Sequence, residues 1–134
     1  MIAIDTNVLI RYLVQDHPAQ SRAATKLLDD AERKGIDCLL SDIVLCEMVW
    51  VLESCYRHAR RQIAAVLEKL LQTGIFSFES AELLEQVVRA YAEGRADFAD
   101  YLICATTKAD GCHKLYTFDR RLKGHKDVVC MGAR

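Results

Sequence analysis

Five acidic residues stand at positions from which they could act together on a metal ion. They come from four separate segments of the chain: Asp5, Glu47, Asp97 with Asp100, and Asp119. If the fold brings them together, the carboxylates repel one another strongly unless a cation neutralises them. Oxygen ligands without histidine or cysteine favour Mg²⁺ or Mn²⁺, and such ions activate water for the cleavage of phosphodiester bonds.

Asp97 and Asp100 also have a simpler explanation. They precede the apolar run at residues 102–105 and fit the N-cap and the third residue of a helix, where carboxylates accept hydrogen bonds from free backbone N–H groups. The competing interpretation is that both belong to a metal site with the other three acids.

Glu47 lies more than one turn inside a helix that the sequence predicts to be apolar on all sides and therefore buried. A desolvated carboxylate without a partner costs on the order of several kcal/mol. An arginine would satisfy it, but metal ligation is the interpretation that also accounts for the other acids.

The segments that carry these acids alternate between strand-like and helical patterns. The strands are predicted at residues 1–4, 37–40, 75–78, 115–118 and 128–131, with helices between them and Gly35, Gly74 and Gly94 as helix ends. This order predicts an α/β fold with a central, mainly parallel sheet flanked by helices. Asp5 and Asp119 then follow strand ends, where ligands gather in parallel sheets.

Size and composition predict one domain over residues 1–134, because the chain has 134 residues of which 51% are hydrophobic. There is no signal-peptide pattern and no apolar run of membrane-spanning length, so we expect a cytoplasmic location and no membrane partner. The six cysteines occur singly, which disfavours a disulfide framework and a zinc site. Residues 132–134 are expected to form a loose end.

Taken in order, these motifs resemble the PIN-domain ribonucleases, and among them the VapC-type toxins of type II toxin–antitoxin pairs. The resemblance covers nearly the whole chain. It rests on Asp5-Thr6-Asn7 before an apolar run, on Glu47 after Ser41-Asp42, on Asp97-Phe98-Ala99-Asp100, and on Thr117-Phe118-Asp119.

The resemblance implies a PIN-like three-layer α/β/α domain and a Mg²⁺-dependent endoribonuclease, with Mn²⁺ as a possible substitute. It implies an RNA substrate, a cognate antitoxin and a homodimer. The implied catalytic acids are Asp5, Glu47, Asp100 and Asp119, and the implied metal ligands are Asp5, Asp97, Asp100 and Asp119. By this resemblance Asp100 is a primary ligand, and Asp97 is an auxiliary ligand that also caps its helix.

Polar and basic neighbours of these acids complete the implied site. Thr6, Asn7 and Thr117 match residues that orient the carboxylates. Each of the three also fits an ordinary cap or turn, and Asn7 in particular fits a cap of the first helix. The formal net charge is −1, but Arg120, Arg121 and Lys123 directly follow Asp119, where they would hold an RNA backbone or form a solvated face.

Two other classes of function remain open from the sequence. A phosphoaspartyl receiver or phosphohydrolase also places an aspartate at a strand end near Mg²⁺, but a phosphohydrolase needs a second acid where Asn7 stands. A non-catalytic module that binds metal or RNA would carry some of the same acids. The presence of all five acids argues against a decayed site.

Overall fold

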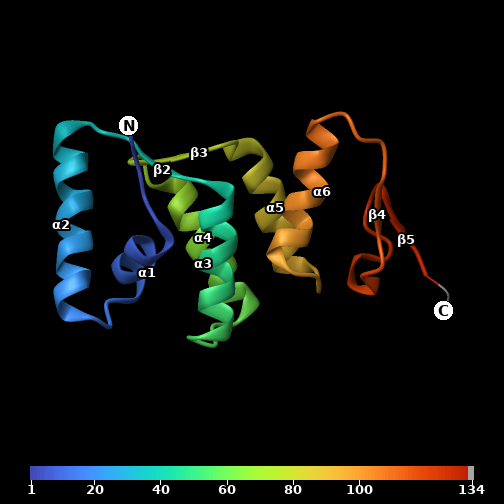
Figure 1. The fold of residues 1–134 in the computed structure, drawn as a ribbon, viewed down its shortest axis with the longest axis horizontal. Coiled ribbons are helices and arrows are strands. Elements are labelled where there is room, and N and C mark those ends of the chain that lie inside the picture. The colour runs from blue at the N-terminus through green and yellow to red at the C-terminus, as the bar shows by residue number, and fades with distance from the viewer. Residues whose placement is uncertain (133–134) are drawn as a thin grey trace. The chain divides into compact units, whose positions relative to one another are not determined.

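The computed structural model describes residues 1–132 (Figure 1). Within them the chain forms six α-helices, one 3-10 helix and five strands. The elements group into two compact units, an N-terminal unit from Met1 to Ala81 and a C-terminal unit that begins at Glu82. Of the loose end predicted at residues 132–134, the last two residues lie outside the described part of the chain.

The N-terminal unit is a parallel three-stranded sheet with four helices. The strands lie in the order β1-β2-β3, with Cys38 between Ile2 and Phe76 in the register. Helix α1 packs against α2 and α3, and α3 packs against α4. The elements are β1 (Ile2–Ala3), α1 (Thr6–Val14), α2 (Pro18–Lys34), β2 (Cys38–Leu40), α3 (Asp42–Ser54), α4 (Arg60–Gln72) and β3 (Phe76–Phe78).

Local sequence signals set the ends of these helices. Pro18 is the first residue of α2, where its missing N–H leaves no hydrogen bond unmade. Gly35 ends α2 in the left-handed region with φ of 66°, which glycine adopts without strain. The hydroxyl of Ser41 accepts a hydrogen bond from the Val44 N–H at 3.3 Å and so caps α3.

Helix α3 contradicts the prediction that it is buried on all sides. Leu45, Met48 and Leu52 belong to the core, but Ile43 is 73% exposed and Trp50 is 63% exposed. Glu47 lies between these two on the sequence and is exposed as well. Because Ile43, Glu47 and Trp50 follow the helical spacing i, i+4, i+7, they share one face of α3.

The C-terminal unit combines two helices with a parallel pair of strands. Its elements are α5 (Ala81–Glu93), α6 (Phe98–Ala109), β4 (Leu115–Thr117), the 3-10 helix η1 (Arg120–Leu122) and β5 (Val128–Cys130). In the register of the strand pair, Tyr116 lies opposite Val129. The rings of Tyr91 and Phe98 meet edge to face at 5.8 Å and join the two helices.

The turn before α6 is fixed by a tyrosine from inside that helix. The Tyr101 hydroxyl accepts hydrogen bonds from the N–H groups of Arg95 and Ala96, at 3.2 and 3.3 Å. This contact needs a glycine at position 94, because a Cβ there would lie 2.6 Å from the ring carbon that carries the hydroxyl. The start of α6 is therefore held in place by its own first turn.

The mixed α/β fold class with parallel strands is confirmed. The strands, however, are divided between a sheet of three and a sheet of two, one in each unit. All six cysteines lie in the described residues and are free thiols. Within residues 1–132, no helix has the length and apolar composition that crossing a membrane requires.

Candidate functional site

Asp5 occupies the junction between β1 and α1. It is the N-cap residue of α1, and its backbone carbonyl accepts the hydrogen bond from the Leu9 N–H at 3.1 Å. Within the described residues its carboxylate makes no capping hydrogen bond, and it is exposed. Asn7 lies inside the first turn of α1, so the alternative that Asn7 caps this helix is wrong.

Glu47 finds its partner in the neighbouring helix. The Thr6 hydroxyl donates a hydrogen bond to Glu47 Oε1 at 2.6 Å, across 41 positions of the sequence. Thr6 is only 8% exposed, so its own surroundings fix the donor. The expectation of a desolvated carboxylate is wrong, because Glu47 is exposed, yet the hydroxyl still orients it.

Asp5 and Glu47, which we call the N-terminal acids, line one cavity of about 520 Å³. Its other lining residues include Trp50 from the exposed face of α3 and Cys46. Burial raises the pKa of the Cys46 thiol to about 11, so this sulfur is neutral at physiological pH and is a poor metal ligand. Carboxylate oxygens are therefore the charged groups of this cavity.

Asp97 and Asp100 lie at the start of α6, as predicted. Asp97 is the N-cap residue, and its backbone N–H donates to Asp100 Oδ2 at 3.1 Å. The predicted places of the two acids, N-cap and third residue of the helix, are thus confirmed, and the Asp100 carboxylate satisfies the N–H of the cap residue. Burial raises the pKa of Asp100 above its usual range, and the charges of Asp97 and Asp119 act in the same direction.

Asp119 follows β4 and is the N-cap residue of η1. Its backbone N–H donates to Thr117 Oγ1 at 3.0 Å, so this threonine orients the main chain of Asp119 and not its carboxylate. The Asp119 carboxylate instead accepts hydrogen bonds from Arg121, through the backbone N–H at 2.9 Å and through the side chain. The side-chain bonds of Arg121 are the largest cause that lowers the pKa of Asp119 to about 2.

Arg121 draws the three acids of this unit together. Its Nε and Nη2 donate to Asp119 at 3.0 and 2.6 Å, and its Nη1 and Nη2 donate to Asp97 at 3.2 and 3.3 Å. Nη2 also lies 3.6 Å from Asp100 Oδ2. We call Asp97, Asp100 and Asp119 the C-terminal acid cluster.

Sequence reasoning placed Arg121 beside the acids but not in contact with them. It grouped Arg121 with Arg120 and Lys123 as residues that hold RNA, and the latter two are exposed around η1. The contact between Arg121 and Asp119 could have been predicted from the sequence, because an arginine two residues after an aspartate in a turn can contact that aspartate. Nothing in the sequence shows that the same guanidinium also reaches Asp97.

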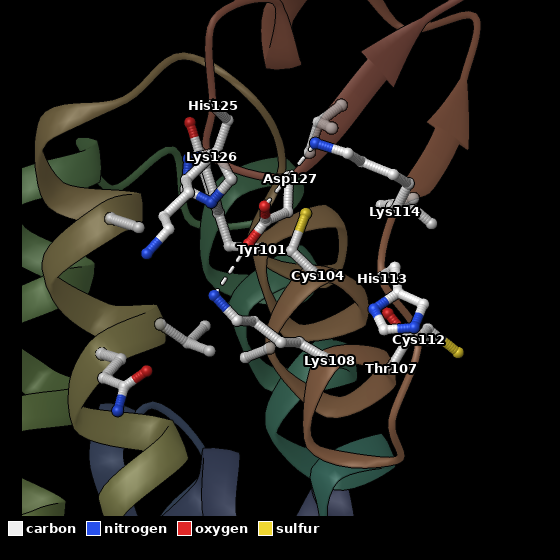
Figure 2. Close-up of a pocket in the computed structure, with 16 residues that line it drawn as sticks. Tyr101, Cys104, Thr107, Lys108, Cys112, His113, Lys114, His125, Lys126 and Asp127 are labelled. Atoms are coloured by element: carbon white, nitrogen blue, oxygen red, sulfur yellow. Dashed lines mark hydrogen bonds and ion pairs between the residues drawn. The ribbon is translucent and has the colours of Figure 1, made fainter.

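The C-terminal unit contains another cavity, which is lined by lysines and not by several acids (Figure 2). It measures about 240 Å³ and lies between α5, α6 and the segments that precede β4 and β5. Figure 2 shows Lys108 and Lys114 reaching Asp127 from two sides, with Nζ to carboxylate distances of 2.8 and 3.8 Å. Hydrogen bonding to Lys108 is the largest cause that lowers the pKa of Asp127.

The structure therefore gathers the predicted residues into two groups, each within one unit. The N-terminal acids lie with Thr6 and Asn7, and the C-terminal acid cluster lies with Thr117 and Arg121. All these acids fall inside residues 2–127, which match the family model of the PIN domain. The chain belongs to the PIN domain family. The match to this one family thus includes residues of both compact units.

A related ribonuclease provides a second comparison. The PIN domain described here is 26% identical over 130 residues to a VapC ribonuclease of Aquifex aeolicus (strain VF5), and the match covers 96% of each chain. The predicted resemblance to PIN-domain proteins of the VapC type is thereby confirmed.

Proposed function

We propose that this chain is a Mg²⁺-dependent endoribonuclease and the toxin of a type II toxin–antitoxin pair. The observation that carries the proposal is that a PIN domain match spans residues 2–127 and includes all five predicted acids. The name of the VapC relative, a ribonuclease, supports RNA as the substrate. We further propose that residues 1–134 act as one PIN-like nuclease domain.

The donor set fits a hard divalent cation. The three carboxylates of the C-terminal acid cluster already converge on one positive group, the guanidinium of Arg121. The N-terminal acids offer further oxygens beside a cavity. Mg²⁺ prefers such oxygen ligands, and Mn²⁺ accepts them. We propose Asp5, Asp97, Asp100 and Asp119 as the residues that would hold the metal.

A bound metal of this kind would supply a Lewis acid for the phosphate and a source of hydroxide at neutral pH. The chain's own contribution is to aim its carboxylates. Thr6 fixes Oε1 of Glu47, and Thr117 fixes the main chain at Asp119. Arg120, Arg121 and Lys123 would bind the RNA backbone through its phosphates.

The proposal includes two protein contacts. One is a cognate antitoxin that covers the site, and the other is a second copy of the chain in a homodimer. The resemblance to VapC-type toxins supports both, and with them we propose a cytoplasmic site of action.

Cleavage of RNA by the purified full chain tests the proposal. We expect structured RNA to be cut in the presence of Mg²⁺ or Mn²⁺ and to remain intact with a chelator. Asp5→Asn and Asp100→Asn should each lower the cleavage rate by at least about 100-fold. Loss of a residue that only orients a metal ligand lowers activity by up to about 100-fold, and loss of the ligand itself should lower it at least as much. Asp29→Asn, which changes an exposed acid on α2, is the matched control.

Thermal unfolding of each variant shows whether it is folded. Cleavage by both Asn variants at the rate of the wild type would overturn the assignment. A protein that binds RNA but never cuts it with either metal would instead be a non-catalytic module.

A further inference from the structure

Arg121 gives the C-terminal acid cluster a positive partner from within the chain. Its guanidinium contacts all three carboxylates, at 3.2 Å from Asp97, 3.6 Å from Asp100 and 2.6 Å from Asp119. One guanidinium against three carboxylates leaves a formal charge of −2 on the group. The cluster is therefore held together but not neutralised.

The backbone around Arg121 holds it in this position. Its own N–H donates to Asp119 Oδ1 at 2.9 Å, so main chain and side chain bind the same carboxylate. The next residue, Leu122, is 2% exposed and anchors the turn in the core. The planar guanidinium presents its donors in a fixed fork, which suits several carboxylate oxygens at once.

This arrangement conflicts with a metal at the same oxygens. A divalent ion such as Mg²⁺ binds carboxylate oxygen at about 2.0–2.1 Å and demands near-octahedral geometry. Arg121 already directs hydrogen bonds at Oδ1 and Oδ2 of both Asp97 and Asp119. Among residues 1–132, no three acidic, histidine or cysteine side chains are arranged to hold a metal ion.

We propose that Arg121 is an exchangeable counter-ion of the C-terminal acid cluster, which a divalent metal must displace in order to bind there. This inference rests on the proposed metal-dependent function. It makes Arg121 a positioning residue: it keeps the three carboxylates close together while no metal is bound, and it lowers the affinity for the metal that replaces it. Once displaced, its guanidinium is available to a phosphate of the substrate.

The size of the effect follows from the competition between the two cations. The metal binds only to molecules in which Arg121 has released the carboxylates. The smaller the fraction of such molecules, the larger the apparent dissociation constant of the metal. Exposed ion pairs are individually weak, but this one joins several contacts, so we expect removal of Arg121 to tighten metal binding about fivefold.

Titration of the metal-free full chain with Mn²⁺, followed by calorimetry and by the electron paramagnetic resonance of free Mn²⁺, measures this change. Arg121→Gln should bind Mn²⁺ more tightly than the wild type. Arg95→Gln is the matched control, because it removes a positive charge two residues before Asp97 from an exposed side chain. Its affinity should change by less than about twofold.

Arg121→Lys distinguishes the effect of the hydrogen bonds of Arg121 from the effect of its positive charge. Lysine keeps the positive charge but lacks the forked donors of arginine. We therefore expect Arg121→Lys to bind Mn²⁺ with an affinity between those of the wild type and Arg121→Gln. An affinity equal to that of Arg121→Gln would also support displacement of the fork. An affinity weaker than the wild type would oppose it.

Nuclear magnetic resonance of the wild type observes the exchange without any substitution. The Nε–H signal of Arg121 should move on addition of diamagnetic Mg²⁺, whereas that of Arg95 should not. An unmoved Arg121 signal at saturating Mg²⁺, together with unchanged or weaker Mn²⁺ binding in Arg121→Gln, would overturn the inference.

These outcomes are distinct from failure of the proposed function. If the wild type cuts RNA with Mg²⁺ while Arg121 stays in place, only the counter-ion role is wrong. If no variant binds a divalent metal and none cuts RNA, the metal-dependent function itself is wrong, and with it the inference.

Discussion

The N-terminal acids are oriented by a neutral group, whereas the C-terminal acid cluster is held by a cation. The Thr6 hydroxyl fixes Glu47 at 2.6 Å but cancels none of its charge. Arg121 fixes its three acids and cancels part of theirs. A carboxylate can thus be held in position either by a neutral donor, which leaves its charge available to a metal, or by a cation, which competes with the metal.

The two groups should therefore respond differently to a metal. A cation that meets the N-terminal acids displaces water from an open cavity of about 520 Å³. At the C-terminal acid cluster it must also displace a guanidinium. The single tryptophan, Trp50, lines the first cavity, so its fluorescence gives a separate signal for that group.

Among changes to the residues that hold these acids, removal of the neutral partner should have the largest effect. Thr6→Val keeps the shape of the side chain but leaves Glu47 without the hydroxyl that orients it. Loss of such an orienting group costs about 10- to 100-fold in metal affinity or activity. Rates of RNA cleavage and Mn²⁺ titrations followed by Trp50 fluorescence measure the loss.

Thr6→Ser retains a hydroxyl at this position and serves as the control. If Thr6→Val and Thr6→Ser have the same cleavage rate and the same Mn²⁺ affinity, the hydroxyl at position 6 does not orient Glu47 for function. The proposed difference between the two groups of acids would then be wrong for the N-terminal acids.

A smaller effect, on stability, is expected at the turn that positions the C-terminal acid cluster. In Gly94→Ala the new methyl group would lie 2.6 Å from a Tyr101 ring carbon and 2.8 Å from the Ala90 carbonyl oxygen. Overpacking of this kind costs about 1–3 kcal/mol in the free energy of unfolding. Unfolding by urea measures it.

Gly74→Ala is the matched control, because nothing lies within 4 Å of a Cβ at that position. The Gly94 variant should also disturb the Nε–H signal of Arg121 and leave Trp50 fluorescence unchanged. Equal stability of the two alanine variants would show that Tyr101 adapts freely and does not fix the turn.

The smallest effect is the dependence of stability on pH that Arg121 confers. Its hydrogen bonds lower the pKa of Asp119 from 3.8 to about 2. A lowered carboxylate pKa stabilises the folded state above the unfolded pKa, and this stabilisation disappears as the pH falls through the folded pKa. The difference in Tm between the wild type and Arg121→Gln should therefore shrink as the pH falls from about 4 to about 2.

Calorimetric scans across this range provide the measurement, with Arg95→Gln as the control that should show no such change. A difference that stays constant down to pH 2 would mean that the Arg121 contacts do not stabilise the charged form of Asp119.

The boundaries of the helices could be predicted because their signals are local. Pro18 and Gly35 mark the two ends of α2, and Ser41 marks the start of α3, through backbone preferences that need no distant partner. The order of strands and helices then predicted parallel pairing. Division of the strands into two sheets could not be predicted, because strand pairing depends on contacts between distant segments.

The acids themselves could be located from the sequence, but their partners could not. On α3 the apolar side chains Ile43 and Trp50 are exposed. Because apolar residues occur all around this helix, its sequence does not show which face is exposed. The contact from Arg121 to Asp97 spans 24 positions and depends on side-chain geometry. Sequence spacing carries no information on either.

Helix α6 carries Asp100 in its first turn and Lys108, which lines the cavity with the lysines, in its last turn. The two residues are eight positions apart, which is about 12 Å along the helix axis at 1.5 Å per residue. At physiological ionic strength, electrostatic interactions are screened over about 8 Å. Salt therefore weakens the attraction between these two charges, although they belong to one rigid element. In dilute buffer the screening length exceeds this distance, and each charge comes under the field of the other.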